Sequence, residues 1–139
     1  MLAWLEEKIQ RTESFLIPQD FGFLKRGGRL TPVAAALGSV LKLKPVMTLT
    51  KDGTRLDKFT VKRTMGAAVK AVIEHLKEKK LDARHILYIS HANALEDAKA
   101  VKEQIEKAFE GLEIRMLELG AAFVTQGGSR CVAIQYIEK

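Results

Sequence analysis

The order of strand-like and helical segments constrains this 139-residue chain most strongly. Short apolar runs at residues 14–17, 86–89 and 112–117 are typical of buried strands. Longer segments, such as residues 65–80, carry apolar residues at helical spacing. Because helices and strands are interleaved along the chain, the sequence predicts an α/β fold, in which a mixed β-sheet of about six strands and the helices packed on it form two layers.

One turn predicts how two of the strands pair. Residues 45–50 and 56–61 have strand character, and the four residues between them place Asp52-Gly53 at the centre of a tight turn. Asp-Gly suits the left-handed backbone of a short hairpin loop. The sequence therefore predicts an antiparallel hairpin.

Two helix starts are marked by polar residues. Thr31-Pro32 predicts a helix that runs through Leu41, since the hydroxyl can cap free N–H groups and proline suits the first helical position. Asn93, with Glu96 three residues later, resembles a capping box. The helix that follows is expected to bury a stripe formed by Leu95, Ala98, Val101, Ile105, Ala108 and Phe109.

Both ends of the chain also carry regular patterns. Residues 2–11 place Leu2, Leu5 and Ile9 on one face with Trp4 beside it and charges opposite, which predicts a short amphipathic helix. At the other end, strand-like residues 121–125 and 131–137 flank a glycine-rich turn.

Composition limits the kind of protein. Apolar residues make up 47% and charged residues 29% of the chain, which are globular proportions. A single cysteine excludes an internal disulfide, and three scattered histidines do not make a metal site. The chain has no apolar run long enough to cross a membrane, and its start lacks the order of a signal peptide. We therefore expect one soluble cytoplasmic domain over residues 1–139, with no transmembrane segment, metal or cofactor.

The formal charge of +6 favours acidic partners such as nucleic acid, a phosphorylated ligand, an anionic membrane or an acidic protein. Basic residues are spread along the chain, and they are not interleaved with exposed aromatic residues as in single-strand binders. A module that binds nucleic acid or another polyanion is the alternative function, but DNA is not the expected partner.

Two polar segments are candidates for ligand binding. In the first, Arg26 and Arg29 flank Gly27-Gly28 just before the helix start at Thr31, so cations and free N–H groups could hold a carboxylate or phosphate. The second is a loop, which could line a ligand site, formed by Thr125, Gln126, Gly127, Gly128 and Ser129. Each segment can equally be a plain turn with solvated side chains.

His91 is the one candidate for a catalytic base. It ends a strand-like run, with Ser90 and Asp97 nearby. Adjacent residues in a strand point to opposite faces, so Ser90 cannot form a triad with His91 there. We expect His91 to lie in the turn that leads into the next helix, and we expect the chain not to be an enzyme.

Five segments, in order and spacing, resemble the DegV family of fatty-acid-binding proteins. They are Leu24-Lys-Arg-Gly-Gly-Arg-Leu30, Ala35-Ala-Leu-Gly-Ser-Val-Leu-Lys-Leu-Lys-Pro-Val46, Lys51-Asp-Gly53, Val61-Lys-Arg-Thr64 and Ile89-Ser-His-Ala-Asn93. The resemblance implies a two-domain protein with a long-chain fatty acid in a tunnel between the domains, of which this chain is the second. It also implies a carrier that presents the acyl group to a partner kinase.

The chain departs from the family pattern in two ways. The first domain is absent, so the chain is either a fragment or a free-standing second domain. The family's last motif resembles His-Thr-Gly-Pro-Gly, and here Gln126 stands at the histidine position and Ser129 at the proline position. The residues of this chain that we expect to bind the ligand are Arg29, Arg26, Gly27, Gly28, Gln126, Thr125 and Ser129. Lys62 and Arg63, beside Lys58 and Lys70, are the residues expected to contact the kinase.

Overall fold

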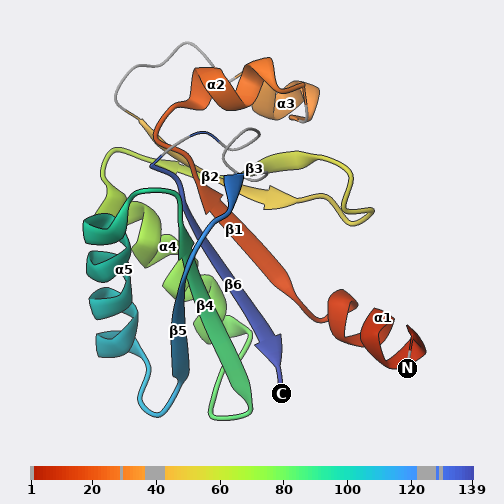
Figure 1. Cartoon of the computed structure of the whole chain (residues 1–139), viewed down its shortest axis with the longest axis vertical. Helices are drawn as coiled ribbons and strands as arrows, with labels where there is room; N and C mark the ends of the chain where they lie inside the picture. Colours follow the sequence, from red (N-terminus) through yellow and green to blue (C-terminus); the bar gives the residue numbers. More distant parts are fainter. Residues whose placement is uncertain (1, 29, 37–42, 122–127, 129) are drawn as a thin grey trace.

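The structure is a computed structural model that describes residues 2–28, 30–36, 43–121, 128 and 130–139 (Figure 1). In it, six strands form one mixed sheet in the order β3-β2-β1-β6-β4-β5, which confirms the predicted α/β fold. The strands are β1 (Glu13–Ile17), β2 (Lys44–Leu49), β3 (Leu56–Lys62), β4 (His85–His91), β5 (Glu113–Glu118) and β6 (Val132–Glu138). The helices are α1 (Leu2–Gln10), α2 (Phe21–Arg26), α3 (Pro32–Ala35), α4 (Met65–Glu78) and α5 (Leu95–Ala108).

The predicted hairpin is confirmed. Strands β2 and β3 pair antiparallel, and Gly53 in the turn between them has a φ of +72°. Hydrogen bonds from Thr50 and Thr54 to the carboxylate of Asp52 hold the turn together and lower the pKa of Asp52 to about 2. The Asp-Gly pair thus supplies both the backbone freedom and the acceptor that the turn needs.

The centre of the sheet is made by strands that are distant in sequence. Strand β1 pairs antiparallel with β2 and with β6, and β6 pairs antiparallel with β4. Strands β4 and β5 are parallel, and α5 connects them. The first and last strands of the chain, β1 and β6, therefore lie side by side (Figure 1).

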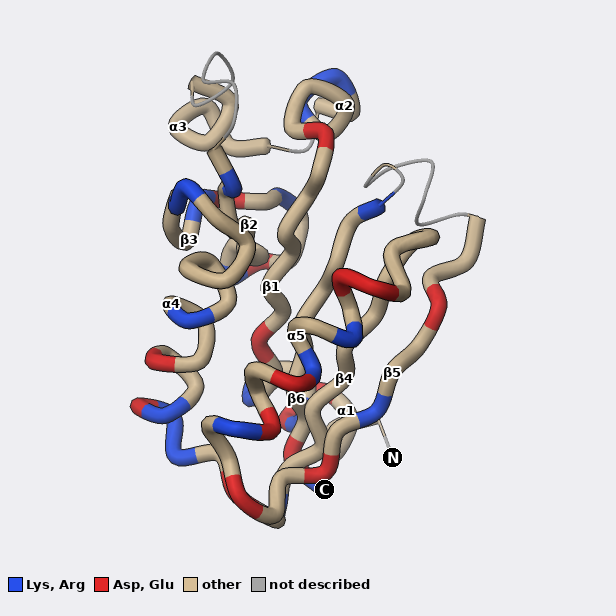
Figure 2. The backbone as a smooth tube through the Cα atoms, turned by 90° about the vertical axis from the view of Figure 1, so that its left-hand side faces the viewer, with Lys and Arg blue, Asp and Glu red and all other residues tan. Residues whose placement is uncertain are grey.

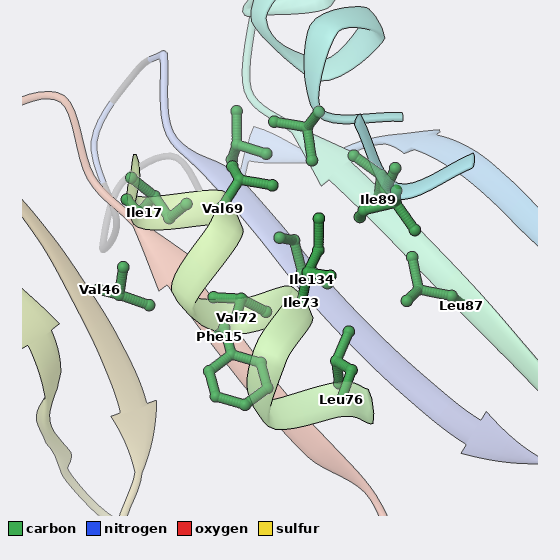
Figure 3. Close-up of a cluster of buried hydrophobic side chains, with 14 of the residues drawn as sticks. Phe15, Ile17, Val46, Val69, Val72, Ile73, Leu76, Leu87, Ile89 and Ile134 are labelled. Atoms are coloured by element: carbon green, nitrogen blue, oxygen red, sulfur yellow. The ribbon is translucent and has the colours of Figure 1, made fainter. Parts of the chain in front are cut away.

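Helices α4 and α5 cover one face of the sheet and form the main core with it. Figure 3 shows side chains of α4 meeting side chains of β1, β4 and β6. Phe15, Leu76, Leu87 and Ile134 are almost fully buried there. Burial of this apolar surface is the main stabilising contribution, at roughly 25 cal/mol per Å².

A second, smaller apolar cluster lies on the opposite face, at the end of the sheet that α2 and α3 cover (Figure 1). Phe15 and Leu16 follow one another in β1 and so point to opposite faces, the first into the main core and the second into this cluster. The buried members of this α2–α3 cluster are Leu16, Leu24, Leu30, Ala34, Met47, Ala92 and Cys131.

The predicted start of α5 is partly wrong. Asn93 does not cap the helix, because its backbone is left-handed (φ +53°) and the N-cap position falls on Ala94, which makes no side-chain cap. The N–H group of Ala94 donates instead to Nδ1 of His91, at 3.2 Å. The expected stripe is also shorter than predicted, since Leu95 is 47% exposed.

Some predictions fall on residues outside the described ranges. The helix that begins at Thr31 is seen over Pro32–Ala35, and the structure does not describe residues 37–42. Residues 122–125, predicted as part of a strand, are also not described. No helix in the described part of the chain combines the length and the apolar character needed to cross a membrane.

Candidate ligand-binding site

The first predicted binding segment follows α2. Asp20 begins this helix by accepting a hydrogen bond from the N–H group of Phe23, at 3.0 Å. The N–H group of Gly28 donates to the carbonyl of Lys25, and Gly28 has a φ of +71°, which glycine adopts without strain. Arg26 is exposed, with its guanidinium group 5.9 Å from the ring centre of Phe23.

The next helix is anchored by Thr31, as the sequence predicts. The Thr31 hydroxyl accepts a hydrogen bond from the N–H group of Ala34, at 3.2 Å, and donates one to Asp57 of β3, at 2.8 Å. The bond from Thr31 is the main reason that the pKa of Asp57 is lowered, and the N–H group of Lys58 adds to it. One side chain thus caps α3 and ties it to the sheet.

Gly128, which precedes β6, lies at the same end of the sheet. Gly128, with a φ of +82°, lies so close to α2 that a Cβ atom on it would be 3.2 Å from the Phe23 ring. The backbone of Ala92, just after β4, accepts from the N–H group of Arg130 and donates to the carbonyl of Cys131. These contacts hold the start of β6, the end of β4 and α2 together.

The predicted ligand residues fall into two groups. Arg26, Gly27 and Gly28 are described, and they lie at the end of the helix that Gly128 contacts. The other predicted ligand residues lie outside the described residues: Arg29, Thr125, Gln126 and Ser129. The structure therefore brings α2 and Gly128 together, while the role of each side chain in binding stays a prediction.

Beneath this polar turn lies the α2–α3 cluster. Leu24 and Leu30, which flank the turn, both point into it, together with Ala92 and Cys131 from the far side. Burial raises the pKa of the Cys131 thiol, so this cysteine is a small apolar residue and not a thiolate nucleophile. One end of the sheet thus combines exposed cations, Lys25 and Arg26, with buried apolar side chains.

The three histidines have structural contacts. Nδ1 of His91 accepts from Ala94, Nδ1 of His85 accepts from the N–H group of Asp82 at 3.3 Å, and Nε2 of His75 lies 2.6 Å from Glu13. Among the described residues there is no group of side chains suited to hold a metal ion. His91 lies in the turn that leads into α5, as the sequence predicts.

A second set of candidate residues lies around the start of α4. Lys62 ends β3, and Arg63 precedes Thr64, whose hydroxyl caps α4 by accepting from the N–H group of Ala67. Both cations are exposed, and neither is within 4.0 Å of a carboxylate in the described ranges. Figure 2 shows basic segments along β3 and α4.

Sequence reasoning missed one contact at the site, the one between Phe23 and Gly128. The two residues are far apart in the chain, so no local spacing could show that they meet. The one available signal was the glycine itself, because a left-handed or crowded backbone position favours glycine.

A family model described as an uncharacterised protein of the DegV family matches residues 1–139 of this chain. A DegV domain-containing protein of Streptococcus pneumoniae is 29% identical over 130 residues, which cover 94% of this chain and 46% of that protein. The chain thus spans about half the length of the curated relatives that it matches.

Solved structures of the same family share the fold. A fatty-acid-binding DegV family protein from Streptococcus agalactiae superimposes with a TM-score of 0.84 at 28% identity, covering 99% of this chain and 48% of that one. DegV from Bacillus subtilis, described as a fatty-acid-binding protein, superimposes with a TM-score of 0.78 at 28% identity. The match covers 99% of this chain and 49% of the Bacillus subtilis chain. The resemblance seen in the sequence is therefore confirmed.

Proposed function

The chain belongs to the DegV family, and on that premise we propose that it is a fatty-acid-binding domain that forms one wall of an acyl-chain site. The observation that carries this proposal is the end of the sheet at which α2, α3 and Gly128 meet. There the exposed cation of Arg26 and the glycine turn lie directly above the α2–α3 cluster.

Each part of a fatty acid has a counterpart in this arrangement. The carboxylate would be held by Arg26 and Arg29, because hydrogen bonds between a guanidinium group and a carboxylate are charge-assisted and strong. The acyl chain would gain about 0.8 kcal/mol for each buried CH₂ group. Thr125, Gln126 and Ser129 are proposed as further polar contacts from the loop before β6.

The chain is proposed to supply only part of the site. It covers 48% of the Streptococcus agalactiae protein, whose description names fatty acid binding for the whole molecule. An acyl chain that lies against one wall keeps part of its surface in water and loses part of the hydrophobic contribution. A first domain of DegV type, in the same polypeptide or in another, would form the other wall.

The proposed role is that of a cytoplasmic carrier and not of an enzyme. The carrier would present the bound acyl group to a partner kinase, and Lys62 and Arg63 would meet an acidic surface on that kinase. Exposed cations of this kind mainly raise the association rate. Both cations are exposed and form no ion pair with a described residue, which supports this proposal.

The alternative is a module that binds nucleic acid or another polyanion through its charge of +6. Basic segments on β3 and α4 favour it (Figure 2). Against it, Glu74 and Glu78 interrupt the basic residues of α4. Polyanion binding would be steeply salt-dependent, whereas binding of an acyl chain would not.

The experiment uses a chimera in which this chain is joined to the half of the Streptococcus agalactiae protein that it does not match. In this chimera we expect Arg29→Ala to weaken palmitate binding at least tenfold without changing the unfolding midpoint. Lys25→Ala is the matched control, since Lys25 is an exposed cation of the same segment. Equal palmitate affinity in the Arg29→Ala variant and the parent would show that Arg29 does not bind the carboxylate.

A further inference from the structure

Helix α1 exposes the apolar face that its sequence predicts. Leu2, Leu5 and Ile9 lie on one side of the helix, and they are 77%, 46% and 61% exposed. Trp4 beside them is 60% exposed, and α1 has no buried residue. An apolar stripe of this kind in a helix of a folded protein normally faces another part of the structure.

The helix is nevertheless held in place on its polar side. Lys8 donates to the carbonyl of Lys139, at 2.8 Å, and Arg11 lies 3.2 Å from Glu138 and 2.6 Å from Glu7. Figure 1 shows that α1 extends away from α4 and α5 and approaches the body at the end of β6. The polar contacts fix α1 beside the sheet while its apolar stripe points elsewhere.

A membrane surface is a poor match for this face. Helices that lie on membranes combine an apolar face with free lysine and arginine residues that reach anionic lipids. In α1 the ammonium group of Lys8 is bonded to Lys139 and lies 5.7 Å from the ring centre of Trp4, and Arg11, which follows the helix, is paired with two carboxylates. The cations near the stripe are therefore already engaged, and Glu6 and Glu7 would repel an anionic surface.

A second copy of this chain is also a poor match. Four partly exposed side chains on a nine-residue helix offer on the order of 500 Å². A stable contact between separate proteins buries about 800 Å² on each partner. Contacts between domains of one protein bury roughly 600–1,500 Å². The stripe together with an equal area on a facing domain comes to about 1,000 Å², which lies in this range.

We propose that the apolar stripe of α1, formed by Leu2, Trp4, Leu5 and Ile9, is a docking surface for the other half of the DegV architecture. The solved relatives align with 99% of this chain and are about twice as long, so a partner of the required kind exists in that family. The inference rests on the proposal that the acyl site is shared with that half. It adds that α1, at the opposite end of the sheet from the proposed carboxylate site, sets the position of the two halves.

Trp4 makes the inference directly testable, because it is the only tryptophan in the chain. In the chain alone we expect a red-shifted Trp4 emission that acrylamide quenches efficiently. In the chimera with the unmatched half of the Streptococcus agalactiae protein, we expect a blue shift and at least a threefold lower quenching constant. A Trp4→Phe chimera gives the background from other tryptophans.

Variants show whether the stripe itself is responsible. The double variant Leu5→Glu with Ile9→Glu should return Trp4 in the chimera to the quenching seen in the chain alone. Leu95→Glu is the matched control, since Leu95 is an equally exposed leucine at the start of another helix, and it should behave like the parent. If the chimera does not fold, the unmatched half is added as a separate polypeptide and the same quenching is measured.

Three results would overturn the inference. The first is equal quenching of Trp4 in the chain alone and in the chimera. The second is protection in the chain alone that rises with protein concentration, which would indicate a second copy. The third is protection only with vesicles of phosphatidylglycerol. Fatty acid bound to the same chimera is measured by mass spectrometry, so protection without fatty acid would contradict only the proposed function.

Discussion

At the scale of single residues, Gly128 makes the sharpest stability prediction. Alanine at this position would keep a φ of +82° and would bring its Cβ atom 3.2 Å from the Phe23 ring. Gly53→Ala is the control, because Gly53 has a φ of +72° but has no atom within 4 Å of the added Cβ. We expect Gly53→Ala to cost about 1 kcal/mol and Gly128→Ala to cost roughly twice that.

Urea unfolding of the two variants measures the difference. The extra cost of Gly128→Ala should disappear when Phe23→Ala is introduced into the same chain, since the crowded ring is then removed. Equal costs for the two alanine variants would mean that Gly128 and the Phe23 ring are not in contact.

Thr31 makes a prediction with a pH dependence. Thr31→Ala removes the cap of α3, which costs about 1 kcal/mol, and it also removes the hydrogen bond to Asp57. The pKa of Asp57 is below its usual value of 3.8 in the folded chain, so its stabilising effect is present above pH 3.8 and is lost as the pH falls through the lowered pKa.

The difference in stability between the parent and Thr31→Ala should therefore be larger at pH 7 than at pH 2.5. Thr31→Ser keeps the hydroxyl and should follow the parent at both pH values. A difference that is constant across the pH series would show that the hydrogen bond from Thr31 does not stabilise the charged form of Asp57.

Residue patterns predicted these local features unevenly. Thr31-Pro32 was sufficient to predict the start of α3, because a cap and its helix lie within four residues. Asn93 and Glu96 formed an equally good pattern and gave a wrong prediction. The contact made there is instead one from His91, whose ring accepts from the N–H group of Ala94, the residue at the N-cap position.

At the scale of elements, we predict that the His91 ring stabilises the start of α5. His91→Leu would leave the N–H group of Ala94 without its acceptor in a buried position, which costs about 1–3 kcal/mol. We expect lower stability in urea and faster hydrogen exchange over residues 94–98. Unchanged exchange and stability would show that the ring does not hold the start of α5.

Reversing the charges that precede α4 should raise the stability of the chain and slow its association with the proposed partner. Lys62 and Arg63 precede a helix whose first turn has no acidic residue. Lys62→Glu with Arg63→Glu should raise stability by several tenths of a kcal/mol, since carboxylates suit a helix N-terminus. The same double variant should slow association with the proposed kinase partner at low salt and leave palmitate binding unchanged.

The control for this charge reversal is Lys77→Glu, which lies in the last turn of α4 and should lower stability. Association at the parent rate across a salt series would mean that Lys62 and Arg63 are only solvated residues. Loss of palmitate would place them at the acyl site instead.

Elements were predicted more reliably than the surfaces they bury. The spacing of Leu2, Leu5 and Ile9 predicted α1, because helical periodicity is a local property. The same spacing could not show that the stripe is exposed. Exposure depends on what lies opposite the helix, and no local pattern contains that information.

At the scale of the whole molecule, the sheet order lay beyond sequence reasoning. The hairpin of β2 and β3 is a local connection, and it was predicted. The central pairing of β1 with β6 joins the two ends of the chain. This pairing is decided by the long-range packing of two apolar strands. The fold class could therefore be predicted from the sequence, but the strand order could not.

The same limit applies to the candidate site. Arg26 and the glycine turn were identified from their residue types. Their place beside the α2–α3 cluster depends on long-range contacts, such as the backbone hydrogen bonds of Ala92 with Arg130 and Cys131. A site assembled from α2, β4 and β6 cannot be located by spacing within any one of them.

The most direct test of the proposed function is native mass spectrometry of two proteins purified in parallel, the chain alone and its chimera with the unmatched half of the Streptococcus agalactiae protein. We predict that the chimera carries one long-chain fatty acid and binds added palmitate below micromolar concentration, while the chain alone does so weakly or not at all. A chimera that carries no fatty acid, rejects palmitate and retains an oligonucleotide would contradict the proposed function and favour the polyanion-binding alternative.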